Sequence, residues 1–105
     1  MFKAIILLKR RDGLPLAEFQ SWWLERHAPL ARSLPGLRGL TFNLVAGDGS
    51  APYDGVSELW FDSQADFEAA YASDHGRAVA ADSMAQVSRR ERLFVTEHPQ
   101  PPTGA

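Results

Sequence analysis

The strand-like segments of this chain carry apolar side chains on both of their sides, and this restricts the possible folds more than any other feature. In the first segment, alternation places Ala4, Ile6 and Leu8 on one side and Ile5 and Leu7 on the other. A sheet with one solvated face would instead alternate between apolar and polar residues. The later segments repeat the pattern, so both faces of the sheet need to be covered.

Four strands and two helices are expected. The predicted strands cover residues 2–10, 37–46, 54–62 and 89–97. The first helix is predicted from Leu16 to about Ser33, where Pro35-Gly36 ends it. The second opens at the capping box Ser63 to Asp66, is interrupted near Asp74-His75-Gly76 and runs to about Gln86. This βαββαβ order predicts an α+β, ferredoxin-like fold, with a four-stranded antiparallel sheet and both helices on one face.

Two helices cannot cover the second apolar face of such a sheet. Within a chain of 105 residues no other element remains to cover it, so we predict a homodimer in which two sheets pack face to face. This arrangement is a dimeric α+β barrel. The domain is expected to span residues 1–98, and the proline-rich residues 99–105 are expected to be a disordered tail.

Composition excludes several classes of function. Thirteen acidic and eleven basic residues give a formal charge of −2, which argues against nucleic acid or an anionic membrane as a partner. The chain has no cysteine, so thiolate catalysis, disulfides and cysteine-ligated metals are excluded. The longest apolar run, Ala4 to Leu8, is far shorter than the roughly 18 residues that a membrane span needs. A cytoplasmic location is the expectation.

Three stretches resemble the EthD family: residues 2–10, Phe19 to Leu30 and Tyr53 to Ser63. The most specific is Trp23-Leu24-Glu25-Arg26-His27-Ala28-Pro29-Leu30, and the resemblance extends over about residues 2–98. The family takes its name from a gene cluster for degrading ethyl tert-butyl ether, beside a cytochrome P450 system. The resemblance implies a dimeric α+β barrel. Relatives of this barrel include polyketide cyclases, muconolactone isomerases, antibiotic-biosynthesis monooxygenases and haem-degrading enzymes, so the fold leaves the reaction open.

His27 is the first candidate catalytic residue. It follows Phe19 and Trp23 on the apolar stripe of the first helix, so its imidazole should point toward the sheet or the mouth of the barrel. An imidazole titrates near neutral pH and can act as a general acid or base on a small carbonyl or lactone substrate. The alternative is a structural histidine that holds the end of the helix before Pro29.

Glu58 is the second candidate. Alternation places it with Val56 and Trp60 on the face assigned to the barrel interior, where an unpaired carboxyl should have a raised pKa and could assist His27. The alternative is a salt bridge to Arg92 or Arg38 at the dimer interface.

Aromatic residues provide candidate walls for a hydrophobic pocket: Trp23, Trp60, Phe94 and Phe42, with Trp22 at an edge. Their alternative role is to fill the core or the interface.

The remaining histidines and the glycines indicate no cofactor. His75 and His98 are not spaced with His27 in any metal-binding motif, and the glycines match neither nucleotide-binding pattern. Neither a metal nor a nucleotide cofactor is therefore expected.

Three hypotheses of function follow from the sequence. The first is a cofactor-independent enzyme, or an accessory to an oxygenase, that isomerises, cyclises or oxygenates a small hydrophobic molecule. The second is a dimeric protein that binds or carries a hydrophobic metabolite without turnover. The third is haem binding through His27 or His75, as in some relatives of the barrel.

Overall fold

The strands form one antiparallel sheet in the order β2-β3-β1-β4. Their bounds are β1 (Phe2–Arg10), β2 (Gly39–Leu44), β3 (Gly55–Phe61) and β4 (Val87–Val95). β3 and β4 pair with β1 on its two sides, and β2 pairs with β3 at one edge. The computed structural model describes residues 1–104; Ala105, the last residue of the predicted tail, lies outside the described residues.

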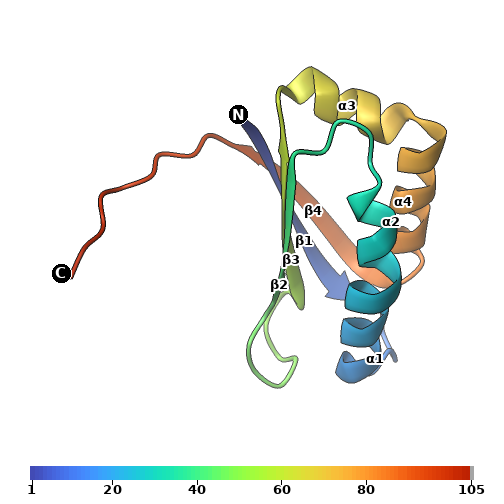
Figure 1. Ribbon diagram of the computed structural model, residues 1–105. Coiled ribbons are helices and arrows are strands. Elements are labelled where there is room, and N and C mark those ends of the chain that lie inside the picture. Colours follow the sequence, from blue (N-terminus) through green and yellow to red (C-terminus); the bar gives the residue numbers. More distant parts are fainter. Residues whose placement is uncertain (105) are drawn as a thin grey trace.

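The helices all lie on one face of this sheet (Figure 1). The first helical segment is continuous and consists of α1 (Leu16–Ser21), a π-helical segment η1 (Trp22–His27) and α2 (Ala28–Arg32). The second consists of α3 (Gln64–Ala72) and α4 (Asp74–Met84). The ferredoxin-like βαββαβ fold predicted from the sequence is therefore confirmed.

The π-helical turn has a local cause in Pro29. A proline inside a regular helix has no N–H to donate, and its ring collides with the carbonyl oxygen four residues earlier, that of Glu25. The wider π turn just before Pro29 relieves this conflict, and its last hydrogen bond runs from the Ala28 N–H to the Trp23 carbonyl oxygen. His27 is the final residue of η1 and is buried.

The second helical segment breaks earlier than the sequence predicts. The break lies at Ser73, whose Oγ accepts a hydrogen bond from the Gly76 N–H at 3.0 Å and so caps α4. The predicted interruption is therefore present but lies one residue before Asp74, and Asp74-His75-Gly76 forms the first turn of α4. Gly76 is needed there because a Cβ at this position would lie 1.9 Å from the carbonyl oxygen of Ala70.

The core fills the space between the helices and one face of the sheet. We call this the covered face, and the other the open face. Side chains on the covered face of β1 and β3 are almost completely buried, whereas those on the open face are only partly buried. The core is built around Ala4, Ile6, Leu8, Phe19, Trp23, Leu59, Phe61, Phe67 and Val79. The predicted alternation is therefore confirmed.

The loop between β2 and β3 is held against β1 by Asp54, which is 1% exposed. Its carboxylate accepts hydrogen bonds from the backbone N–H of Arg10 at 3.0 Å and from the Arg10 guanidinium at 2.8 Å. The Lys9 ammonium lies 3.4 Å from the same carboxylate and donates to the carbonyl oxygens of Gly49 and Ala51. Each charge in this cluster has a partner, so Asp54 anchors the loop.

Residues 96–104 follow β4 without regular secondary structure and extend away from the domain (Figure 1). Within residues 1–104, no helix has the length and apolar character that crossing a membrane requires.

Candidate functional site

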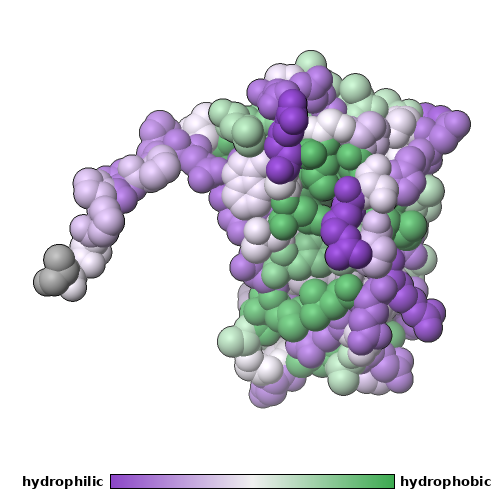
Figure 2. Space-filling view, in the orientation of Figure 1, coloured by the Kyte–Doolittle hydropathy of each residue, from purple (hydrophilic) through white to green (hydrophobic). Residues whose placement is uncertain are grey.

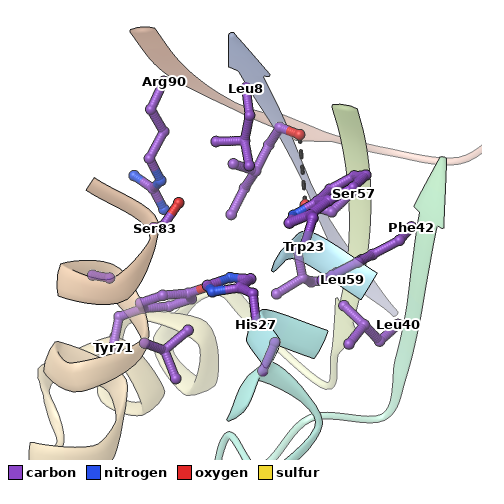
Figure 3. A pocket seen from close by; sticks show the side chains of 14 residues that line it. Leu8, Trp23, His27, Leu40, Phe42, Ser57, Leu59, Tyr71, Ser83 and Arg90 are labelled. Atoms are coloured by element: carbon purple, nitrogen blue, oxygen red, sulfur yellow. Dashed lines mark hydrogen bonds between the residues drawn. The ribbon is translucent and has the colours of Figure 1, made fainter. Parts of the chain in front are cut away.

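A small cavity lies inside the domain, between the covered face and the helices (Figure 3). Its free volume is about 20 Å³, which is room for about one water molecule. The walls are mostly apolar, with a few polar side chains at one end. The lining residues are Ile6, Leu8, Trp23, His27, Ala31, Leu40, Phe42, Ser57, Leu59, Tyr71, Val79, Ala80, Ser83 and Arg90.

His27 lines this cavity from the end of η1, as the sequence predicts. Its Nδ1 lies 2.8 Å from Oδ2 of Asp82 on α4, and the His27 side chain is 8% exposed. Burial lowers the pKa of His27 below 6.5; the hydrogen bond and charge of Asp82 act in the opposite direction, and the positive charge of Arg90 adds to the lowering. The imidazole is therefore neutral at neutral pH. Since Nδ1–H is placed to donate to the carboxylate, Nε2 keeps its lone pair.

Three further polar side chains surround the imidazole end of the cavity: Tyr71 from α3, Ser83 from α4 and Arg90 from β4 (Figure 3). Burial raises the pKa of Tyr71, against the effect of the nearby Arg90 guanidinium, so its phenol stays protonated. Ser83 is 4% exposed. Tyr71, Ser83 and Arg90 can all donate hydrogen bonds into the cavity.

Arg90 differs from the other arginines of the chain. Arg10, Arg38, Arg77 and Arg89 each form an ion pair with a carboxylate. Among the arginines of the described chain that form no ion pair, Arg90 is partly buried and the others are exposed. Its guanidinium therefore brings a positive charge to the cavity wall that no carboxylate within salt-bridge distance neutralises.

Two stacked aromatic rings close the other end of the cavity. The rings of Trp23 and Phe42 lie 4.3 Å apart with an interplanar angle of 11°, and the Phe42 ring is 6.2 Å from that of His27. Trp23 reaches this position by packing on Gly55, where a Cβ would come within 2.7 Å of the indole. Trp23 and Phe42 therefore both line this cavity, and their role as walls of a ligand pocket stays a prediction.

Glu58 does not join His27. It lies on the open face, where the Lys3 ammonium is 2.6 Å from its carboxylate and the Asn43 amide donates to it at 3.2 Å. Lys3 lowers the pKa of Glu58, whereas the sequence led us to expect a raised pKa for an unpaired carboxyl. The alternative of a salt bridge holds, but the partner is Lys3. Strand order puts β1 beside β3, whereas Arg92 and Arg38 interact elsewhere.

Trp60 and Phe94 do not line the cavity either. Trp60 lies on the open face, where its indole N–H donates to Glu97 and the Lys3 ammonium lies 4.8 Å from its ring. Phe94 is on the covered face but packs near the opposite end of β1, with its ring 5.0 Å from that of Phe2. Both residues were predicted to line the pocket, and alternation along single strands could not tell which face or end the cavity occupies.

Trp22 and His75 have packing roles. Trp22 is 9% exposed, its ring lies 5.1 Å from that of His27, and it is not among the residues that line the cavity. His75 is not a solvated turn residue: its Nε2 lies 2.8 Å from the carbonyl oxygen of Leu30, which connects the start of α4 to α2. Within residues 1–104, no three or more histidine and acidic side chains are grouped closely enough to hold a metal ion.

The sequence reasoning missed Asp82, Ser83 and Arg90 as site residues. Arg90 shares a strand face with Phe94, and this alternation was a usable signal. Asp82 and Ser83 had none, because they approach His27 only through the packing of α4 on η1, across 55 positions of sequence.

Comparison with known proteins agrees with this fold. The model of the EthD domain matches residues 11–88, about three quarters of the chain. The chain belongs to the EthD family. A comparison with curated protein sequences finds no significant match.

Several solved structures are similar to this EthD-family chain. An ethyl tert-butyl ether degradation (EthD) family protein from Bacillus halodurans is 25% identical, with a TM-score of 0.80 over 93% of this chain and 99% of that one. A dimeric ferredoxin-like protein of unknown function from Thermobifida fusca is 18% identical, with a TM-score of 0.74 over 91% and 90%. A variant of SnoaB, a cofactor-independent oxygenase from Streptomyces nogalater, is 19% identical, with a TM-score of 0.70 over 96% of both chains. The last two likenesses establish the shared fold.

Proposed function

We propose that this EthD-family protein is an enzyme of small-molecule degradation in which His27 removes and returns a proton on a small, largely hydrophobic substrate. The observation that carries the proposal is the His27–Asp82 pair, with Nδ1 held 2.8 Å from a carboxylate and the ring facing a cavity. This arrangement selects the tautomer in which Nε2 is the base.

Nε2 takes a proton from an acidic C–H or O–H next to a carbonyl or aromatic system, which leaves an enolate or phenolate on the substrate and an imidazolium on His27. The carboxylate of Asp82 stabilises that imidazolium. Return of the proton to another atom gives isomerisation, and attack of the enolate on a carbonyl gives cyclisation. Oxygenation, which is the activity of SnoaB, would also consume dioxygen as a co-reactant.

We further propose that the working protein is a homodimer through the open face. Partly exposed apolar residues on this face support the proposal, among them Ile5, Leu7, Val56 and Leu93, the last 53% exposed. The related protein from Thermobifida fusca is described as dimeric. In such a dimer the Lys3–Glu58 pair would lie at the interface, and Glu58 would contribute to association.

The test follows solvent deuterium into a panel of 1,3-dicarbonyl compounds, lactones and phenols by proton NMR. This readout detects the proton transfer before the full reaction is known. Wild-type protein should accelerate exchange in at least one compound, and His27→Gln should lower that rate by about 10²–10⁴-fold. The matched control, His98→Gln in the tail, should exchange like the wild type. A panel member that binds without exchange in the wild type would support the carrier hypothesis instead.

A further inference from the structure

We propose that the groove between β2 and α2 is a second compartment of the substrate site, and that the substrate is an amphipathic organic anion. Its apolar body would lie in this groove and its charged oxygen would reach Arg90 in the cavity. The inference rests on the function proposed for His27 and names the class of substrate that the site takes.

The groove has the size and character of a ligand site. It measures about 470 Å³, within the range of roughly 300–1,000 Å³ usual for small-molecule sites. Figure 2 shows hydrophobic surface exposed where β2 and α2 lie at the front, with hydrophilic side chains at its rim. The residues that line it are Leu24, Ala28, Arg32, Leu37, Arg38, Gly39, Leu40 and Phe42.

The groove and the cavity of His27 share part of their walls. Leu40 and Phe42 line both spaces. The cavity alone holds about one water molecule, so a substrate that reaches His27 has to displace part of its wall. Phe42 belongs to β2, an edge strand that pairs on one side only, and its ring stacks on Trp23 without any hydrogen bond to break. Rotation of the Phe42 ring would join the two spaces into one site.

The charge of the site selects an anion. The guanidinium of Arg90 is partly buried and lies within salt-bridge distance of no carboxylate in the described chain, and its neighbours Tyr71 and Ser83 are neutral donors. A partly buried cation without an acidic partner is stabilised by a charged oxygen that accepts its hydrogen bonds. Asp82 does not fill this role, because its carboxylate is engaged with His27. A carboxylate or phenolate therefore complements the cavity, and an apolar body complements the groove.

The experiment compares two probes of equal size, 4-phenylbutyrate and the neutral 4-phenylbutyramide, by isothermal titration calorimetry. Wild-type protein should bind the anion about ten- to a hundredfold more tightly than the amide. Arg90→Gln should bring the two affinities together. The matched control is Arg92→Gln, on the same face of β4, because Arg92 lies over the Phe67 and Phe94 rings outside the cavity. This variant should keep the preference.

The groove is tested with the same probes. Leu24→Glu, at a groove residue that is 44% exposed, should weaken both probes at least about tenfold, since it places a carboxylate where the phenyl ring lies. Leu30→Glu on α2 is the control: Leu30 is 37% exposed and lies outside the groove lining, so both affinities should stay unchanged. The inference is wrong if the wild type fails to bind 4-phenylbutyrate at millimolar concentration. It is equally wrong if Arg90→Gln keeps the preference for the anion, or if Leu24→Glu leaves both affinities unchanged.

This experiment and the deuterium-exchange test fail separately. If deuterium exchange depends on His27 but Arg90→Gln keeps the preference for the anion, the substrate class is rejected and the proton-transfer function is retained. If the preference for the anion depends on Arg90 but no compound exchanges deuterium, the proton transfer is rejected and the two-compartment binding site is retained.

Discussion

The two faces of the sheet use the same strands for different purposes. On the covered face, Leu59 and Phe61 are at most 2% exposed and pack into a core that surrounds the His27 cavity. On the open face, Glu58 and Trp60 alternate with these two residues along β3 and remain partly exposed. The polar groups differ as well: Glu58 has Lys3 as its partner, whereas Arg90 has no acidic partner.

This difference separates residues that stabilise from residues that can act on a ligand. In a charged pair such as Lys3–Glu58 the two groups bind each other, so few of their hydrogen-bonding positions remain for a substrate. His27 and Arg90 instead line the cavity, where a ligand could form hydrogen bonds with their side chains. A half-buried charged or titratable group is a candidate for a functional site when it lines a cavity and keeps a hydrogen-bonding atom free for a ligand.

The largest expected effect comes from Trp23 on the covered face. Trp23→Ala should lower the free energy of unfolding by about 3–5 kcal/mol, because it removes a side chain that is 1% exposed and leaves a void beside the cavity. Urea unfolding should show this loss at every protein concentration. Trp60→Ala on the open face should lower the free energy of unfolding by less. This loss should become smaller on dilution, because the dimer then dissociates. A Trp60 effect that is independent of concentration would contradict an interface on the open face.

Leu93 provides the next largest effect. Leu93→Glu should weaken dimerisation at least about 100-fold, since a two-fold symmetric interface would bury the new carboxylate twice. Sedimentation velocity should show a monomer at concentrations where the wild type is a dimer. Met84→Glu, at an exposed position of α4, is the control and should sediment like the wild type. If Leu93→Glu remains a dimer, the proposed interface is not on this face.

A smaller effect is expected from the titration of His27. Its pKa in the folded protein lies below 6.5, so the unfolded chain takes up the proton first as the pH falls. The free energy of unfolding should therefore decrease as the pH falls from 6.5 to the lowered pKa of the folded state. Below that pKa, His27 should cause no further decrease. Thermal unfolding of His27→Gln should lack this decrease. A variant that follows the wild-type pH dependence would show that another group is responsible.

The smallest effect is expected from Glu58. Lys3 lowers the pKa of Glu58 below 4.5, so the stabilisation is present above pH 4.5 and is lost as the pH falls through the pKa of the folded state. Glu58→Gln should flatten the dependence of stability on pH in that range, and Lys3→Gln should have the same effect. The double variant should show no larger effect than either single variant. Deuterium exchange should be unchanged in Glu58→Gln. A loss of exchange would restore the catalytic role that the sequence suggested.

The sequence was informative wherever a signal repeats within one element. The alternation in β1 and β3 placed each residue on the correct side of its strand, and the spacing of Phe19, Trp23 and His27 placed all three on the buried side of the first helix. The capping box at Ser63 marked the start of α3 correctly. The break between α3 and α4 was predicted near Asp74-His75-Gly76 and lies at Ser73, whereas Gly76 lets α4 approach the Ala70 carbonyl.

The site itself depended on contacts between distant segments. Alternation shows that Glu58 and Leu59 point to opposite sides of β3, but it does not show which side faces the helices at His27. Only the strand order β2-β3-β1-β4 and the packing of α4 on η1 decided that Glu58 lies next to Lys3, and that Asp82 and Arg90 lie near His27. The sequence by itself therefore determined the elements, the buried side of the first helix and the division of each strand into two sides, because these follow from periodicity along the chain. The tertiary structure decided which polar groups are paired and which face the cavity, because pairing depends on distances between segments that periodicity does not encode.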